Sequence, residues 1–215
     1  MDTKAEQKDG FSEAQTSKNA GEKRGLLDPV ALGEKLFRLR DYTPIPLIIL
    51  MWFVASPTKV SATIGTMIII CGEVLRIYSV SFIGSISRTR SDNLGSRLVT
   101  SGPFRYVRNP LYVGNFLITF GFAFYSAEPV FVALATALFA FQYFNIVRYE
   151  ETLLRVRFGE DFDRYCQEVP AWFPSRLPAL DEIEWPLELA GAIRSEKRTF
   201  LALGAVFVLL FLSGR

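Results

Sequence analysis

Long apolar runs alternate with polar, often basic segments along this chain. The apolar runs lie at residues 45–56, 60–83, 111–125, 130–147 and 199–212. Residues 60–83 exceed the roughly 18 residues that a membrane-crossing helix needs, whereas 45–56 and 199–212 are short for a full crossing. The pattern predicts an all-α, polytopic transmembrane helical bundle of about four to five spans, with further helices outside the bilayer.

Three regions follow from the same pattern. Residues 1–25 are polar and contain almost no apolar side chains, so we expect a disordered polar tail. In residues 26–41 apolar positions alternate with Lys and Arg in the manner of an amphipathic helix at a membrane surface. Residues 42–215 then form the membrane-embedded domain.

Residues 111–125 and 130–147 are separated only by the short turn Ser126-Ala127-Glu128-Pro129. A connection this short predicts an antiparallel helical hairpin. Arg and Lys gather in the N-terminal tail, in residues 85–109 and in residues 148–198, which places these segments and the N-terminus on the cytoplasmic side of an integral membrane protein. The beginning and the end of the hairpin therefore face one side and can share a pocket.

Two charged residues interrupt the strongest apolar run. Glu73 and Arg76 are three residues apart, so they lie on one helical face and can pair with each other. Two interpretations remain open for them: an ion pair facing the interior of the bundle, or part of a polar cavity for a substrate or cofactor.

The composition excludes several classes of site. The chain has no histidine, and its two cysteines, Cys71 and Cys166, lie far apart in segments of different character. A His-based catalytic triad and a His- or thiol-ligated metal site are therefore not expected. The net charge of +2 is too small to suggest nucleic acid as a partner.

A basic loop leads into the first helix of the hairpin. Asn109 is a favourable N-cap residue and Pro110 suits the first helical position. A helix start of this kind attracts anions, and Arg105 and Arg108 add positive charge to it. The alternative is a basic flank that only anchors a membrane helix.

The opposite arm of the hairpin carries Glu150-Glu151. A pocket with a basic helix start, glutamates and tyrosines suits a ligand of both charges, such as S-adenosylmethionine. A nucleotide phosphate or a lipid headgroup would fit much of the same chemistry.

Two motifs around the hairpin resemble a known family. The first is LVTSGPFRYVRNPLYVG over residues 98–114. The second consists of Glu150-Glu151, Leu154, Phe158-Gly159, Phe162, Tyr165, Val169-Pro170 and Pro174. In this order, within about residues 72–174, they resemble the isoprenylcysteine carboxyl methyltransferase and phospholipid methyltransferase superfamily of integral membrane enzymes.

The resemblance implies a cytosolic helical region that binds S-adenosylmethionine, formed within residues 98–174, and a lipid substrate that enters from the bilayer. The cofactor-binding residues that it implies are Gly102, Pro103, Arg108, Asn109, Pro110, Tyr112, Glu150 and Glu151. We take Arg108 and Glu150 as the candidate catalytic residues. Candidate substrate-binding residues are Glu73, Arg76 and Trp172.

The chain departs from the family pattern at Asn109, where many members have histidine. Asparagine caps a helix and donates from its amide, but it cannot accept a proton near neutral pH. A carboxylate acceptor needs little help from a base, whereas an amine acceptor must lose a proton. Glu150 or Glu151 is the nearest candidate for receiving it.

We therefore predict S-adenosylmethionine-dependent methyl transfer to a lipophilic acceptor, either an isoprenylcysteine-type carboxylate or a phospholipid amine, at the cytosolic face of a membrane. The expected partners are a lipid or lipidated substrate and the membrane, with no nucleic acid and no metal. One alternative is an NADPH-dependent membrane reductase resembling the steroid reductase group, although adjacent carboxylates would repel the extra phosphate of NADPH. The other is a non-catalytic lipid-binding membrane protein.

Overall fold

The computed structural model describes residues 29–83, 97–186 and 188–212. Every regular element within these residues is helical, as the sequence predicts. The predicted disordered tail, residues 1–25, lies outside the described residues, as does the beginning of the predicted amphipathic helix. The rest of that helix is present as α2, Pro29–Leu39.

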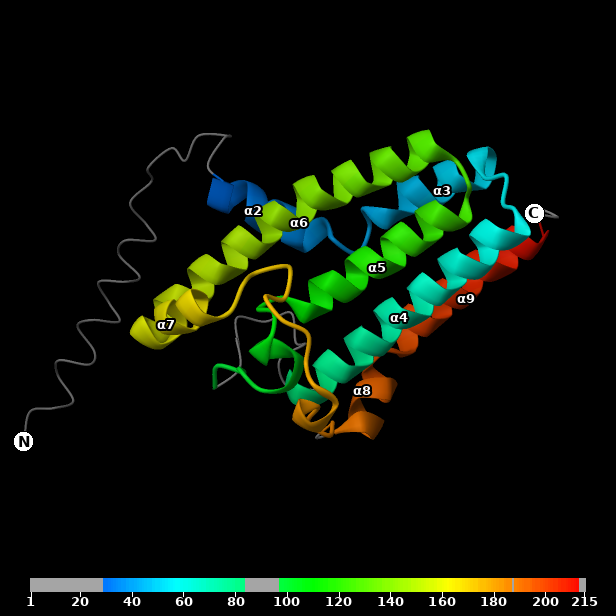
Figure 1. Ribbon diagram of the computed structural model, residues 1–215. Helices are drawn as coiled ribbons and strands as arrows, with labels where there is room; N and C mark the ends of the chain where they lie inside the picture. Colours follow the sequence, from blue (N-terminus) through cyan, green and yellow to red (C-terminus); the bar gives the residue numbers. More distant parts are fainter. Residues whose placement is uncertain (1–28, 84–96, 187, 213–215) are drawn as a thin grey trace, which may run out of the picture.

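Long helices make up most of the molecule in Figure 1, together with a shorter apolar helix, α3. They are α3 (Pro44–Val54), α4 (Lys59–Ile83), α5 (Pro110–Tyr125), α6 (Pro129–Phe158) and α9 (Lys197–Leu212). Helices α3, α5, α6 and α9 meet in one apolar core, which is centred on Ala123, Ala135 and Leu210. The C-terminal apolar run is thus part of the bundle.

Helices α4 and α5 approach closely because glycines face each other across their interface. A Cβ atom at Gly65 would lie 2.7 Å from the carbonyl oxygen of Gly121, and one at Gly72 would lie 2.8 Å from that of Gly114. The reverse contacts are equally short, so each pair is reciprocal. Small residues at such positions let membrane helices pack backbone against backbone.

The predicted hairpin is present. Ser126, which is fully buried, closes the turn by donating from its hydroxyl to the carbonyl of Ala123 at 2.6 Å. Helix α6 then continues past the apolar run as far as Phe158, and Gly159 ends it with φ 52°, a conformation that favours glycine. The short helix α7 (Glu160–Glu168) follows and buries Phe162 and Tyr165.

Helix α2 lies along α6. Gly33 makes this possible, because its α-carbon faces the backbone carbonyl of Asn145 and the side chain of Tyr149 with no room for a Cβ atom. The remaining polar segments form the 3₁₀ turns η2 (Gly102–Arg105) and η3 (Leu180–Glu182) and helix α8 (Leu189–Ser195).

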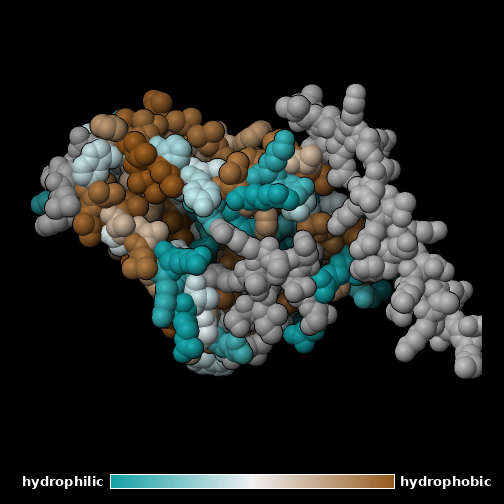
Figure 2. All heavy atoms as spheres, turned by 180° about the vertical axis from the view of Figure 1, so that it is seen from behind, coloured by the Kyte–Doolittle hydropathy of each residue, from teal (hydrophilic) through white to brown (hydrophobic). Residues whose placement is uncertain are grey.

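The surface of the bundle is largely apolar. Figure 2 shows apolar side chains over the end of the molecule formed by α3 and the α5–α6 turn. Exposed residues there include Phe53 and Val130, at 71% and 81% exposure. Of the described helices, α4 and α6 are long and apolar enough to cross a membrane. The count of four to five spans stays a prediction.

Candidate functional site

The beginning of α5 is held by the loop that follows α7. Asn109 occupies the N-cap position, and its backbone carbonyl accepts bonds from Tyr112 and Val113. Its side chain does not cap the helix, so the expected side-chain cap is wrong. The Asn109 amide instead donates to the carbonyl oxygen of Ala171 at 3.2 Å, which ties the helix start to the loop. Pro110 is fully buried at the first helical position.

Arg108 joins three elements. Its Nε donates to Oε1 of Glu151 at 3.0 Å, and its Nη2 lies 2.9 Å from the same oxygen. The remaining terminal nitrogen donates to the carbonyl oxygens of Cys166 and Val169, at 3.2 and 2.5 Å. Only 13% of the Arg108 side chain and 18% of the Glu151 side chain are exposed. Arg108 therefore fastens the start of α5 to the end of α6 and to α7.

Tyr112 and Glu150 connect the two halves of the hairpin directly. The hydroxyl of Tyr112, on the first turn of α5, donates to Oε2 of Glu150 at 2.6 Å. A bond this short is typical of a hydroxyl that donates to a charged carboxylate. The two sequence motifs thus meet in space, as the predicted topology requires.

An aromatic wall continues from Tyr112 into the bundle. The rings of Tyr112 and Tyr143 lie 5.0 Å apart, and Tyr143 stacks on Phe139 at 4.1 Å. Trp172, a candidate substrate-binding residue, packs edge-on against Phe144 with ring centroids 5.1 Å apart. These rings give the site an apolar side next to its charged residues.

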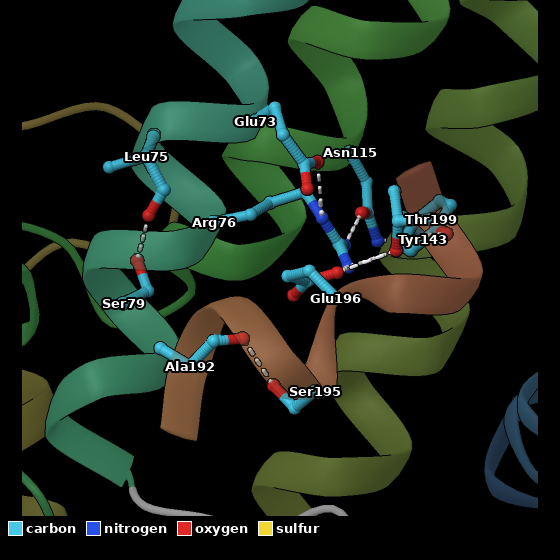
Figure 3. Close-up of polar contacts among 10 residues, drawn as sticks. All are labelled: Glu73, Leu75, Arg76, Ser79, Asn115, Tyr143, Ala192, Ser195, Glu196 and Thr199. Carbon is cyan, nitrogen blue, oxygen red and sulfur yellow. Dashed lines mark hydrogen bonds and ion pairs between the residues drawn. The ribbon is translucent and has the colours of Figure 1, made fainter. Parts of the chain in front are cut away.

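Glu73 and Arg76 belong to a buried polar cluster next to Tyr143, which Figure 3 shows in close-up. Nε of Arg76 lies 3.4 Å from Oε2 of Glu73, so the predicted ion pair is present. A terminal nitrogen of Arg76 also donates to Glu196 at 2.8 Å, and another donates to Asn115. Asn115 in turn donates to the hydroxyl of Tyr143 at 3.2 Å, which connects the cluster to the aromatic wall.

Sequence reasoning missed Glu196 and Asn115. Glu196 is fully buried at the junction of α8 and α9, although it follows a polar segment and precedes Lys197. Its partner, Arg76, lies 120 positions earlier in the chain, and a local sequence pattern cannot predict a pairing over this separation. Asn115 is the one side-chain amide in the apolar run of residues 111–125. A lone amide in such a run is the signal that could have identified it.

Gly102 and Pro103 lie behind the site, buried in the 3₁₀ turn η2. Gly102 adopts φ 58°, and a Cβ atom there would lie within 2.7 Å of the Phe82 ring. The turn sets Phe104 against α7, where the Tyr165 hydroxyl donates to the Phe104 carbonyl at 2.6 Å. Burial raises the pKa of the Tyr165 hydroxyl well above its usual value, so it stays a neutral donor.

A large cavity, about 3,120 Å³ in volume, opens beside these residues. Of the predicted site residues its wall contains Arg76, Arg108, Asn109, Pro110, Tyr112, Glu150 and Glu151. Apolar side chains of α3, α5, α6 and α9, among them Leu47, Leu138 and Leu203, line another part of the wall, and further charged side chains, among them Arg40 and Lys197, also line it. The charged site residues and apolar side chains of four helices thus line the same cavity.

Residues 60–161 match the family model of the phospholipid methyltransferases. The chain is also 31% identical over 116 residues to protein-S-isoprenylcysteine O-methyltransferase B of Arabidopsis thaliana, which covers 51% of this chain and 57% of that protein. Over this part of its length the chain is similar to the phospholipid methyltransferases and to the isoprenylcysteine O-methyltransferases. Helices α4 and α6, which are long and apolar enough to cross a membrane, support an integral membrane protein.

Another similar protein is named for metal resistance and not for methyl transfer. The chain is 32% identical over 112 residues to the nickel-cobalt-cadmium resistance protein NccN of Alcaligenes xylosoxydans xylosoxydans, covering 52% of this chain and 49% of that protein. A solved structure, the eukaryotic intramembrane Ras methyltransferase ICMT, is 22% identical and covers 72% of this chain and 52% of its own, with a TM-score of 0.44. The chain spans about half the length of the curated relatives that it matches.

Proposed function

We propose that this protein transfers a methyl group from S-adenosylmethionine to a lipophilic acceptor. The observation that carries the proposal is the 2.6 Å hydrogen bond between Tyr112 and Glu150, which joins the two superfamily motifs at the wall of the cavity. The names of the matched methyltransferases support it. We further propose that the site faces the cytosol and that the N-terminus is cytoplasmic. The reason is that Arg and Lys gather in the N-terminal tail and in residues 85–109 and 148–198, and basic segments of membrane proteins lie on the cytoplasmic side.

The residues around the cavity suit S-adenosylmethionine by their chemistry. Glu150, whose position the Tyr112 hydroxyl fixes, offers a carboxylate to an ammonium or ribose hydroxyl. The Tyr112, Phe139 and Tyr143 rings offer π-faces to a cationic sulfonium or to an adenine ring. When bound, the cofactor supplies a methyl group for transfer to a nucleophile; this methyl group is carried on a positively charged sulfur.

The protein's part in this reaction is positioning and exclusion of water. Arg108 and Asn109 hold the start of α5 against the loop after α7, which keeps Tyr112 aligned with Glu150. Such preorganisation supplies much of the rate enhancement when both reactants are already activated. When the acceptor is an amine, Glu150 or Glu151 would accept its proton; a carboxylate acceptor needs no such step.

The acceptor is lipophilic in this proposal because the cavity continues as an apolar space between α3, α5, α6 and α9. A prenyl or acyl chain fits such a space, and its reactive carboxylate or amine would then lie near Glu150. Trp172 and Arg76 remain candidate substrate contacts, with Glu73 fixing Arg76 from behind.

Calorimetric titration of detergent-purified protein tests the proposal. S-adenosylhomocysteine should give a saturable signal and NADPH none, and Glu150→Gln should lose most of the affinity. Glu160→Gln is the matched control, since Glu160 lies exposed at the start of α7, outside the cavity wall. Binding of NADPH alone would support the reductase, and binding of neither would support a non-catalytic lipid-binding protein; both results contradict the proposal.

A further inference from the structure

We expected Arg108 to bind an anionic group of the ligand, but its guanidinium already binds groups of the protein itself. Its guanidinium contacts Glu151 and two backbone carbonyls, and the Glu151 carboxylate neutralises its charge. A ligand that carries a carboxylate beside an ammonium still needs a cation close to Glu150. The wall of the cavity offers one from a different part of the chain.

Arg40 follows directly after α2 and lines the cavity together with Tyr112 and Glu150. Its guanidinium carbon lies 3.8 Å from the centre of the Phe37 ring, which fixes the side chain by a cation–π contact. Its ion pair with Asp41 is loose, with Nε 3.8 Å from Oδ1. The side chain is 30% exposed, so its outer face is accessible to a ligand.

The docking of α2 on α6 holds Arg40 in this place. Gly33 packs against the backbone of Asn145, and the Phe37 ring lies 5.9 Å from that of Tyr149, the residue before Glu150. Phe37 also packs on the same aromatic cluster as Tyr112. Arg40 lies close enough to Glu150 and Tyr112 to act electrostatically on both.

We propose that Arg40 binds the carboxylate of the amino-acid end of the cofactor while Glu150 binds the ammonium of the same group. The proposal rests on the proposed function. It makes α2, which lies outside the residues that match the family model, a part of the binding site. The two charges of an amino acid sit on one carbon atom, so their partners must line one pocket, and Arg40 and Glu150 both line this cavity.

The experiment compares two ligands that differ in the amino-acid end. S-adenosylhomocysteine carries it, whereas 5′-methylthioadenosine keeps the nucleoside and sulfur but lacks both charges. Arg40→Gln should weaken binding of S-adenosylhomocysteine roughly tenfold to a hundredfold, as loss of a charge-assisted contact does, and leave 5′-methylthioadenosine unchanged. Arg40→Lys, which keeps the charge, should restore part of the affinity.

Lys35→Gln is the matched control. Lys35 lies on α2, five positions before Arg40, is exposed and does not line the cavity. We expect it to bind both ligands as the unaltered chain does. Equal losses for both ligands in Arg40→Gln would show that Arg40 only supports the fold, and undiminished binding of S-adenosylhomocysteine would overturn the proposal directly. If the unaltered chain binds neither ligand, the proposed function fails, and this proposal fails with it.

Discussion

Replacing Arg108 by alanine tests whether this arginine holds the site together. The change removes one ion pair and the two bonds to the carbonyls of Cys166 and Val169. It leaves the carboxylate of Glu151, whose side chain is only 18% exposed, without its cation. The structure therefore predicts a loss of stability in addition to any loss of ligand affinity.

The expected size follows from burial. Removing one partner of a buried ion pair costs about 3–5 kcal/mol, because the other charge is left desolvated. The pair here is mostly but not fully buried, so we expect about 3 kcal/mol, a large part of the roughly 5–15 kcal/mol that stabilises a typical protein. The nearby pair of Arg155 and Asp163 has a distance of 2.7 Å, but both side chains are 49% exposed. Arg155→Ala should therefore cost only about 0–1 kcal/mol.

Unfolding in mixed detergent micelles, followed by tryptophan fluorescence, gives the free energies of unfolding. Arg108→Ala should unfold at clearly lower denaturant than Arg155→Ala. Adding Glu151→Gln to Arg108→Ala should recover part of the loss, because it removes the unpaired charge. Equal stability of the two arginine variants would refute the reasoning.

Two further predictions concern packing and pH. Gly72→Ala should destabilise the protein by about 1–3 kcal/mol, since its methyl group would lie 2.8 Å from the Gly114 carbonyl. Gly204→Ala, with open space around it, should be neutral or slightly stabilising in the same unfolding assay. Hydrogen bonds from Arg176, above all, lower the pKa of Glu182 from 4.5 to about 2. The resulting stabilisation is complete above about pH 4.5 and is lost as the pH falls towards 2. A carbon-detected NMR titration should show this pKa, and Arg176→Gln should raise it.

Much of the fold was predictable because it depends on local pattern. The apolar runs and the short turn before Pro129 act through nearby residues, and the structure confirms the hairpin that they predict. The pairing of Glu73 with Arg76 is local for the same reason.

The partners of the site residues were less predictable. Asn109 favours capping in isolation, but the loop after α7 brings the Ala171 carbonyl to its amide, and this contact replaces the cap. Arg108 donates to carbonyls more than fifty positions away, and its place in the basic loop does not predict these contacts. Arg40 and Glu196 are brought to the cavity and to the buried cluster by the docking of α2 and α9, and sequence spacing contains no information on either docking.

Transfer of a labelled methyl group tests the central claim most directly. Purified protein, reconstituted with extracted membrane lipids and lipidated proteins, would be incubated with S-adenosylmethionine that carries a radiolabelled methyl group. We predict label in the organic-extractable or lipidated-protein fraction, and its loss in Glu150→Gln but not in Glu160→Gln. Label no higher than in vesicles without the protein would contradict the claim that this cavity is a methyl-transfer site.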